Sequence, residues 1–301
     1  MAEKLRAGVI GVGFMGALHC KAYSLLNDID FVGVFDADQN KAKEIAVKFN
    51  TNSFVDLESL LNNVDIVSVA TPTTLHYEIC LKCIDHKKHM LIEKPIAATL
   101  SQAKDLVDRI EKSSLLSAVG YIERFNPAVI ELFKLLDGKE IKTIEAIRVA
   151  PRVNRANDVS AIFDLMIHDI DIVMALTKSI PKYFESVGEK IDSDVYNRVS
   201  AQIIFNNGVK ALLFADKNAN KKERKIKIKC EDFSLEADLI NKKIYHSKKG
   251  EYFVENQEEP IVMEVKNFVE SVKTSQKPVV SAKDSFKSFQ VAWDFEEKIK
   301  Q

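Results

Sequence analysis

The stretch Leu5–Gly16, LRAGVIGVGFMG, decides the fold of the first part of the chain. An apolar run of strand length leads into Gly11, Gly13 and Gly16, and a helical pattern follows. In βαβ units that bind dinucleotides, the first glycine allows a tight turn and the second lets the backbone approach a pyrophosphate. The third lets helix and strand pack closely, and N–H groups at the helix start face the phosphates. The stretch therefore predicts a dinucleotide site.

An acidic residue indicates which dinucleotide is expected. Asp36 stands twenty residues beyond the last glycine, at the end of the apolar run FVGVFD. A carboxylate there accepts hydrogen bonds from ribose hydroxyls and repels a 2′-phosphate. No arginine follows, since the next residue is Ala37. The sequence favours NAD over NADP, and Lys41 and Lys43 keep NADP open as the less favoured alternative.

Composition limits the class of protein. The chain has 301 residues, 46% hydrophobic and 29% charged, so we expect two globular domains. A net charge of −1 provides no field for nucleic acid or an anionic membrane, and the lysine-rich Lys221–Lys229 alternates like a half-solvated strand. No apolar run could span a bilayer, and no signal peptide is visible, so a cytoplasmic location is expected.

The four cysteines are too few for a disulfide framework in so long a chain. Cys80 and Cys83 form a CxxC pair in a helical pattern, and no second pair completes a zinc site. We therefore expect core packing for both, and no metal.

Up to residue 120, short apolar runs alternate with helical patterns, which predicts a parallel doubly wound sheet of the Rossmann type in residues 1–120. The expected strands are Leu5–Ile10, Phe31–Asp36, Ser53–Val55, Val64–Ala70, His89–Ile92 and Leu115–Gly120, and the expected helices include Asp38–Phe49, His76–His86 and Ser101–Lys112.

In residues 121–301 strand patterns follow one another in series, with helical patterns before and after them, which predicts an α+β domain with an open, mostly antiparallel sheet. The expected strands are Ser200–Phe205, Val209–Ala215, Lys225–Cys230 and Phe233–Leu239, with helices at Pro127–Leu136, Ser160–Leu176, Pro260–Thr274 and Ala282–Lys300. The NNG at Asn206–Gly208 predicts a hairpin.

Two segments follow strands of the first domain, where doubly wound sheets bind ligands. Lys94, in Glu93-Lys94-Pro95, could donate to a substrate hydroxyl and stabilise the charge that grows as hydride leaves. Glu93 could orient Lys94 or touch the cofactor, and a surface salt bridge is an equal alternative for this tripeptide. After the fourth strand, Thr71 and Pro72 with His76 are expected near the ribose and nicotinamide, although helix capping by the next two threonines is an alternative.

A polar cluster interrupts the apolar helical segment FDLMIHDIDIV. Asp164, His168 and Asp171 recur at i, i+4 and i+7 and so share one face, whereas Asp169 lies on another. A carboxylate one turn away raises the basicity of an imidazole, so His168 is a candidate base. The alternative is a packed core histidine.

Candidate substrate residues lie near the domain junction. Tyr121, Arg124 and Asn126 follow the sixth strand. Arg152 and Arg155 lie close together in a chain with few arginines, which suggests a bound phosphate. The alternative is ordinary surface pairing with nearby carboxylates.

These motifs together resemble the Gfo/Idh/MocA oxidoreductases. The resemblance rests on GVIGVGFMG with Asp36, on TPTTLH, on Glu93-Lys94-Pro95 and on Asp164-x-x-x-His168. It implies Lys94, Asp164 and His168 as the catalytic group. It implies a substrate-binding second domain, which in this family often packs sheet to sheet in dimers, so a homodimer or homotetramer is expected.

The expected contacts follow from the motifs and the resemblance together. Cofactor contacts are expected from Gly11, Gly13, Phe14, Met15, Gly16, Asp36, Thr71, Pro72, His76, Glu93 and Lys94. Substrate contacts are expected from Tyr121, Arg124, Asn126, Arg152, Arg155, Asp164 and His168.

Within the family, GYIERFNPAV followed by DLMIHDIDIV is similar to members known as MviM-like or as UDP-N-acetylglucosamine 3-dehydrogenases. This similarity implies oxidation of a nucleotide sugar at its 3-hydroxyl. The segment DVSAIFD lacks the glycine-rich lead-in common in the family, so the shape of the substrate pocket stays open. The alternatives are a dehydrogenase of a free polyol, inositol or simple sugar, and a non-catalytic NAD sensor.

Overall fold

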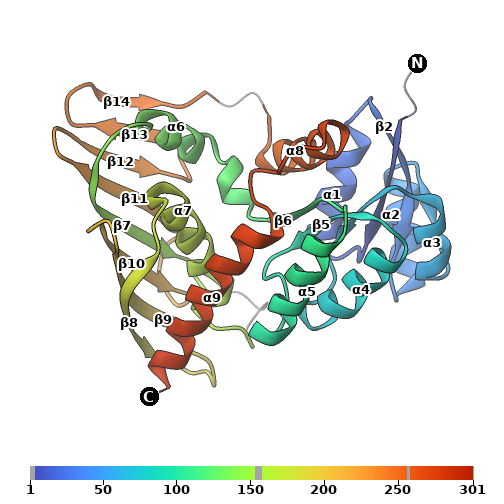
Figure 1. Cartoon of the computed structure of the whole chain (residues 1–301), viewed down its shortest axis with the longest axis horizontal. Coiled ribbons are helices and arrows are strands. Elements are labelled where there is room, and N and C mark those ends of the chain that lie inside the picture. Colours follow the sequence, from blue (N-terminus) through green and yellow to red (C-terminus); the bar gives the residue numbers. More distant parts are fainter. Residues whose placement is uncertain (1–3, 153–157, 256–257, 301) are drawn as a thin grey trace. The chain divides into compact units, whose positions relative to one another are not determined.

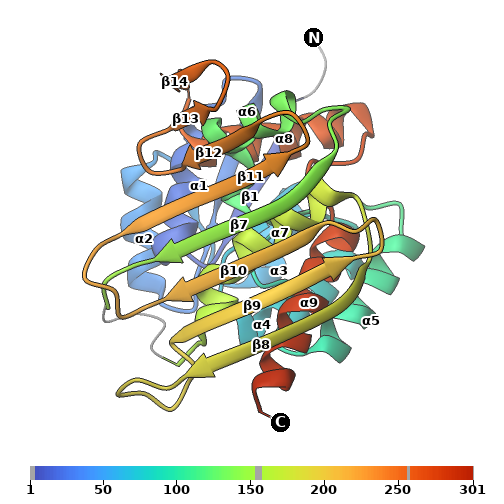
Figure 2. The same cartoon turned by 90° about the vertical axis from the view of Figure 1, so that its left-hand side faces the viewer.

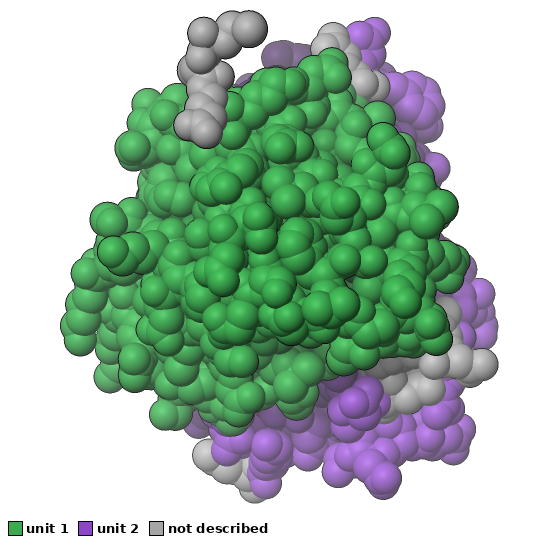
Figure 3. Space-filling model, turned by 90° about the vertical axis from the view of Figure 1, so that its right-hand side faces the viewer, with its two compact units in different colours: residues 1–122, 258–287 green, residues 123–257, 288–301 purple. Residues whose placement is uncertain are grey.

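The computed structural model describes residues 4–152, 158–255 and 258–300. The chain forms two compact units, residues 1–122 with 258–287 and residues 123–257 with 288–301 (Figure 3). The first boundary lies two residues beyond the expected one at 120/121. The return of residues 258–287 to the first unit was not expected.

The first unit contains a six-stranded sheet in the order β3-β2-β1-β4-β5-β6, and every neighbouring pair is parallel. Figure 1 labels β2, β5 and β6 of this sheet. The strands are β1 (Leu5–Ile10), β2 (Ile29–Phe35), β3 (Asn52–Ser53), β4 (Ile66–Val69), β5 (His89–Glu93) and β6 (Ser117–Gly120). The helices are α1 (Phe14–Ser24), α2 (Gln39–Lys48), α3 (Leu57–Asn63), α4 (Thr73–Asp85) and α5 (Leu100–Lys112). This architecture confirms the predicted doubly wound parallel sheet.

Helix α8 (Pro260–Thr274) completes the core of this unit. Its buried Val265 and Phe268 belong to the same apolar cluster as Ala22 of α1 and Ile29 of β2. The sequence assigned this helix to the second domain. The periodicity of an amphipathic helix identifies its apolar face but not the sheet that this face covers.

The second unit contains an eight-stranded sheet in the order β14-β13-β12-β11-β7-β10-β9-β8 (Figure 2). The strands are β7 (Ile141–Val149), β8 (Pro181–Glu189), β9 (Arg198–Phe205), β10 (Lys210–Asp216), β11 (Glu223–Cys230), β12 (Ser234–Asp238), β13 (Lys243–His246) and β14 (Gly250–Phe253). Among the described strands of this sheet, only β7 and β10 pair in parallel, which confirms the mostly antiparallel prediction.

Helical elements accompany this sheet, and Figure 2 shows α6, α7 and α9 behind it. They are a short 3₁₀ turn, η1 (Ile122–Phe125), then α6 (Pro127–Leu135), a π turn, η2 (Ile162–Met166), with α7 (Ile167–Thr177), and the later part of α9 (Ala282–Ile299). The predicted hairpin at residues 206–208 joins β9 to β10, and Gly208 has a φ of +85° there.

Strand β7, in the centre of this sheet, was not expected from the sequence. Its isoleucines recur every three residues, at Ile141, Ile144 and Ile147, which resembles a helical pattern more than strand alternation. The strand also carries Arg148, a charged residue on the buried side.

The two CxxC cysteines, Cys80 and Cys83, are buried in α4 as free thiols, which confirms their core role. Burial raises the pKa of the Cys83 thiol to about 12, so the thiol stays protonated at neutral pH. In the described part of the chain, no helix combines the length and apolarity needed to cross a bilayer.

Candidate active site

The glycine-rich turn has the geometry that a pyrophosphate site requires. Gly11 leaves β1 with a φ of +85°, a conformation that side chains disfavour. A Cβ at Gly16 would lie 1.9 Å from the carbonyl oxygen of Gly11, so only glycine fits there. A Cβ at Gly13 would meet nothing within 4 Å. Gly13 is exposed at the N-cap of α1, where the backbone stays open to an approaching phosphate.

Asp36 lies beside this turn at the end of β2. One oxygen of its carboxylate accepts a hydrogen bond from the N–H of Val12 at 2.7 Å, and the other accepts from the N–H of Asp38 at 2.8 Å. The backbone therefore holds the partly exposed carboxylate next to the glycine turn, as ribose recognition requires. Phe14 is exposed and Met15 is partly buried in the first turn of α1.

His76 connects two of the predicted segments. Its Nδ1 lies 2.9 Å from the carbonyl oxygen of Pro95, and its Nε2 lies 2.9 Å from that of Thr71. The side chain is buried, and burial lowers its pKa. The structure thus gives His76 a structural task, holding the loop after β4 against the loop after β5. Helix α4 begins at Thr73 with Pro72 as its N-cap, so capping by the threonines was wrong.

Glu93 is buried at the end of β5. Its Oε1 lies 2.9 Å from Nε2 of His19, and its Oε2 accepts a hydrogen bond from the N–H of Lys94 at 3.2 Å. A Cβ at Gly120 would lie 2.9 Å from Oε1, so the neighbouring strand needs glycine there. Of the two roles considered for Glu93, this geometry supports orienting Lys94, which is half-buried and joined to Pro95 by a cis peptide.

The second candidate group lies at the start of the α7 segment, which is not the uniform α-helix that was expected. Residues 162–166 form a π turn, a rare feature that is frequent at functional sites. The wider turn changes the angular spacing between Asp164 and His168. One oxygen of Asp164 lies 3.2 Å from Nζ of Lys217, which also donates to the carbonyl oxygen of Val159 at 2.8 Å.

Lys217 was missed by the sequence analysis. It follows β10 directly and is largely buried, although lysines usually are exposed. Its position just after an apolar strand was the available signal.

Other predicted residues have partners within the second unit. Asp171 is buried and pairs with Arg124 at 3.2 Å, and Arg124 also stacks on the ring of Phe133. The Nδ2 of Asn126 donates to Glu123 and to the carbonyl oxygen of Leu239, which uses both of its hydrogens. These contacts indicate structural tasks for Arg124 and Asn126, and their expected contact with substrate stays a prediction.

Three further substrate residues stay untested. Tyr121 is fully buried at the end of the first unit's opening segment. Arg152 is exposed and donates to the carbonyl oxygen of Asp192 at 3.1 Å. Arg155 lies outside the described residues, so the predicted phosphate site remains a prediction.

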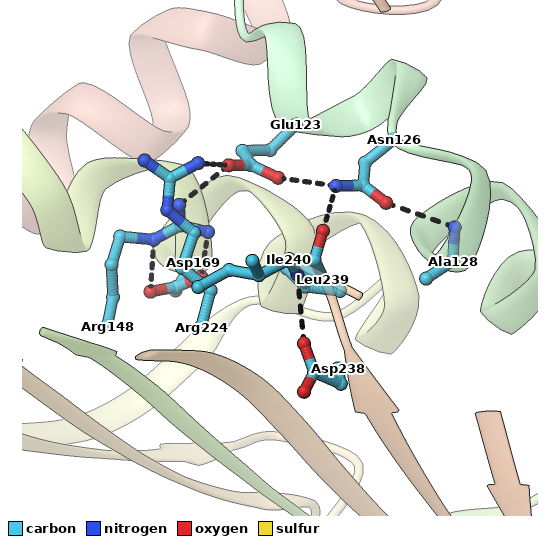
Figure 4. Close-up of polar contacts among 9 residues, drawn as sticks. All are labelled: Glu123, Asn126, Ala128, Arg148, Asp169, Arg224, Asp238, Leu239 and Ile240. Atoms are coloured by element: carbon cyan, nitrogen blue, oxygen red, sulfur yellow. Dashed lines mark hydrogen bonds and ion pairs between the residues drawn. The ribbon is translucent and has the colours of Figure 1, made fainter. Parts of the chain in front are cut away.

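An ionic network of four residues lies within the second unit: Glu123, Arg148 and Asp169 are buried, and Arg224 is partly exposed (Figure 4). Arg148 of β7 donates twice to Asp169 of α7, at 2.9 and 2.7 Å, and once to Glu123 at 2.8 Å. Arg224 of β11 donates to the same oxygen of Glu123 at 2.5 Å. Two positive and two negative groups make the network neutral.

The charges within the network favour ionised side chains. Burial alone would raise the pKa of Glu123, but the guanidinium groups of Arg148 and Arg224 outweigh it and hold the pKa below its ordinary value. Burial alone would lower the pKa of Arg148, but Asp169 and Glu123 raise it. The network fixes α7 on the sheet from the face that carries Asp169, and so sets the position of the preceding residue, His168.

Comparison with known proteins supplies independent information. The family model described as an oxidoreductase family with an NAD-binding Rossmann fold, that of Gfo/Idh/MocA, matches residues 5–121. A UDP-N-acetylglucosamine 3-dehydrogenase of Acidithiobacillus ferrooxidans is 33% identical over 82% of this chain and 78% of its own. A myo-inositol 2-dehydrogenase of Thermotoga maritima is 23% identical over 93% of this chain and 92% of its own.

Solved structures agree with the fold. The Acidithiobacillus ferrooxidans UDP-N-acetylglucosamine 3-dehydrogenase superposes with a TM-score of 0.94 at 27% identity, covering 99% of this chain and 98% of its own. An oxidoreductase from Agrobacterium radiobacter in complex with NAD⁺, L-tartaric acid and magnesium superposes with a TM-score of 0.90 at 16% identity, covering 99% and 97%.

Proposed function

Because the chain belongs to the Gfo/Idh/MocA family of NAD-binding oxidoreductases, we propose that it oxidises the 3-hydroxyl of a nucleotide sugar such as UDP-N-acetylglucosamine. The observation that carries this substrate is the similarity to a dehydrogenase of that name over most of both chains. Lys94, Asp164 and His168, the family's catalytic set, are all present.

The residues of the first unit fit NAD. The exposed backbone at Gly13 and the N-terminus of α1 would receive the pyrophosphate, and Asp36 would accept from the adenosine ribose. The carboxylate disfavours a 2′-phosphate, so NAD is preferred over NADP. When bound, the nicotinamide accepts the hydride that leaves the sugar carbon.

The protein's own side chains manage the remaining proton and charge. The imidazole of His168 takes the proton of the hydroxyl, while the ammonium of Lys94 stabilises the negative charge that develops on the oxygen. Asp164 orients the imidazole, and the ion pair with Lys217 holds Asp164 in place. The proton goes to the protein and the hydride to the cofactor, so atoms and charge balance.

The first test replaces Lys94 by alanine. We expect turnover to fall roughly 10²–10⁴-fold with NAD affinity largely kept, because Lys94 acts on the substrate oxygen. Lys104→Ala, at an exposed position of α5, is the matched control. Unchanged turnover in Lys94→Ala would remove this residue from the mechanism.

The second candidate substrate is a free polyol or simple sugar. It is supported by the similarity to a myo-inositol 2-dehydrogenase along nearly the whole chain. Absorbance of reduced cofactor, followed with UDP-sugars, inositols and free hexoses, distinguishes the two substrate classes. Reduction with none of them, despite NAD binding, would favour the alternative of a non-catalytic sensor.

The proposal includes a homo-oligomer, a homodimer or homotetramer, in the cytoplasm. Figure 2 shows the broad face of the eight-stranded sheet, with the unit's helices behind it. Tyr183, Val187 and Leu212 are exposed large apolar residues of its strands. Such exposed apolar side chains favour contact with another protein surface, and a second copy of this sheet is the occupant that we propose.

A further inference from the structure

Three ionisable side chains meet in the interior of the first unit, behind the Glu93-Lys94 segment. His19 comes from α1, Glu93 from β5 and Glu264 from α8, and their exposed fractions are 0%, 6% and 2%. One nitrogen or oxygen of each lies within 4.8 Å of those of the other two. Buried groups of this kind are uncommon unless they are paired, so the cluster requires an explanation.

The histidine in this cluster has a hydrogen-bond chain behind it. The hydroxyl of Tyr23 lies 3.0 Å from Oγ of Ser68, which lies 3.1 Å from Nδ1 of His19. These contacts are satisfied when Tyr23 donates to Ser68, Ser68 donates to Nδ1 and Nε2 donates to Glu93. An imidazole with a hydrogen on both nitrogens, donating to Ser68 and to Glu93, satisfies the two contacts of His19 as well.

Glu264 differs from its neighbours. In the described part of the chain, neither of its buried oxygens has a hydrogen-bond partner. A second ionised carboxylate beside Glu93, away from water, would be strongly unfavourable. Burial and the charge of Glu93 raise the pKa of Glu264 well above its usual range.

The other groups that face Glu264 do not offset this cost. Helix α1 supplies His19, Cys20 and Tyr23, and burial raises the pKa values of the last two, so both are neutral. Strand β5 supplies Glu93, and strand β6, SAVG, has no titratable residue. His19 contacts Glu93 and offers at most one positive charge for the two carboxylates.

We propose that Glu264 is a neutral, protonated acid in the native state, and that it thereby acts as a positioning residue for Lys94. With the proton on Glu264, both oxygens of Glu93 remain acceptors: one lies 2.9 Å from Nε2 of His19, and the other accepts from the backbone N–H of Lys94. The role in positioning rests on the proposed function of Lys94, whereas the proton on Glu264 does not.

The experiment compares two variants of the full chain. Glu264→Gln keeps the shape and a hydrogen-bond donor without an ionisable proton, and Glu264→Leu removes both. Glu270→Gln, at an exposed position of the same helix, is the control. Infrared difference spectra of each variant against wild type, recorded at neutral pH, detect the carbonyl band of a protonated carboxylic acid. Urea unfolding is measured between about pH 5 and pH 8.

We expect the band of a protonated acid in wild type and Glu270→Gln, and its loss in both Glu264 variants. Above the ordinary pKa of glutamate, the unfolded chain releases the proton of Glu264 while the native state keeps it. The native state therefore becomes less stable, relative to the unfolded state, as pH rises. The ratio of folded to unfolded wild type should therefore fall by up to tenfold per pH unit, relative to Glu264→Gln. Glu264→Gln should keep more turnover than Glu264→Leu, with the difference in kcat and not in the KM for NAD.

Two results would overturn the proposal: the same pH dependence in wild type and Glu264→Gln, or a stoichiometric divalent metal in the purified protein that both Glu264 variants lose. Infrared and unfolding measurements need no substrate. An inactive wild type would therefore refute the proposed function and leave the protonated state of Glu264 standing.

Discussion

Replacing Arg148 by methionine should strongly destabilise the protein. Arg148 has an exposed fraction of 1% and makes three charged hydrogen bonds, two to Asp169 and one to Glu123. In the variant, Glu123 retains Arg224 at 2.5 Å, whereas Asp169, with an exposed fraction of 2%, loses both bonds. One buried carboxylate is therefore left without its counter-charge.

Breaking one partner of a buried ion pair costs about 3–5 kcal/mol, and total stabilities of domains are about 5–15 kcal/mol. Urea unfolding at pH 8 measures this loss of unfolding free energy. An unchanged slope m shows that the same unfolding transition is compared in wild type and variant. Arg109→Met, which removes the exposed ion pair with Asp105, is the control and should leave the midpoint unchanged, because water and salt screen such pairs.

The loss of stability in Arg148→Met should depend on pH. Burial raises the pKa of Asp169 even beside Arg148, and removing that guanidinium raises it further. In the variant, native Asp169 then keeps a proton that the unfolded chain releases, so the penalty grows as pH rises from about 5 to about 8. The double variant Arg148→Met with Asp169→Leu should be more stable than Arg148→Met at pH 8, because no buried charge remains unpaired. A loss below about 1 kcal/mol, or a larger penalty at acidic pH, would refute this reasoning.

Three other predictions follow from the geometry. In Gly13→Ala the new Cβ meets nothing within 4 Å, so the variant should keep the unfolding midpoint and weaken NAD binding at least tenfold in calorimetry. In Gly16→Ala the new Cβ would lie 1.9 Å from a carbonyl oxygen, so this variant should lower the unfolding midpoint itself. Lys217→Met should lower turnover by about 10²-fold without changing NAD affinity, because Asp164 loses the partner that holds it; unchanged turnover would contradict that role. Leu212→Lys should shift the mass in light scattering towards the monomer, and an unchanged mass would count against the proposed sheet-to-sheet contact.

The first unit was predictable because its signals are local. The glycine turn and Asp36 lie within one βαβ unit, so their positions follow from local backbone geometry. The structure places Asp36 beside the glycine turn, as that geometry requires. The fully buried β4 lies within the expected strand Val64–Ala70. The assignment of α8 was missed because its partner, α1, lies more than two hundred residues away in sequence.

The buried polar groups of the second unit were not predictable in the same way. Asp169 was set aside because it lies on a different face of the helix from His168, yet that face carries the ion pair that anchors the helix. Its partner, Arg148, lies in β7, one of the strands that were not expected from the sequence. A sequence pattern shows where a charge lies on its own element, but the compensating charge comes from another element, so it becomes visible only in three dimensions.

The return of residues 258–287 to the first unit has a consequence for synthesis on the ribosome. Although β1 is made first, its unit lacks Val265 and Phe268 of the core until α8 has left the exit tunnel. The second unit in turn needs residues 288–301. At about 5–20 residues per second, translation of these 301 residues takes about 15–60 s, and neither unit can complete its core until its part of residues 258–301 has been made. The first unit therefore cannot complete its core before the second unit's strands have been made, and its apolar surface stays incompletely covered until then.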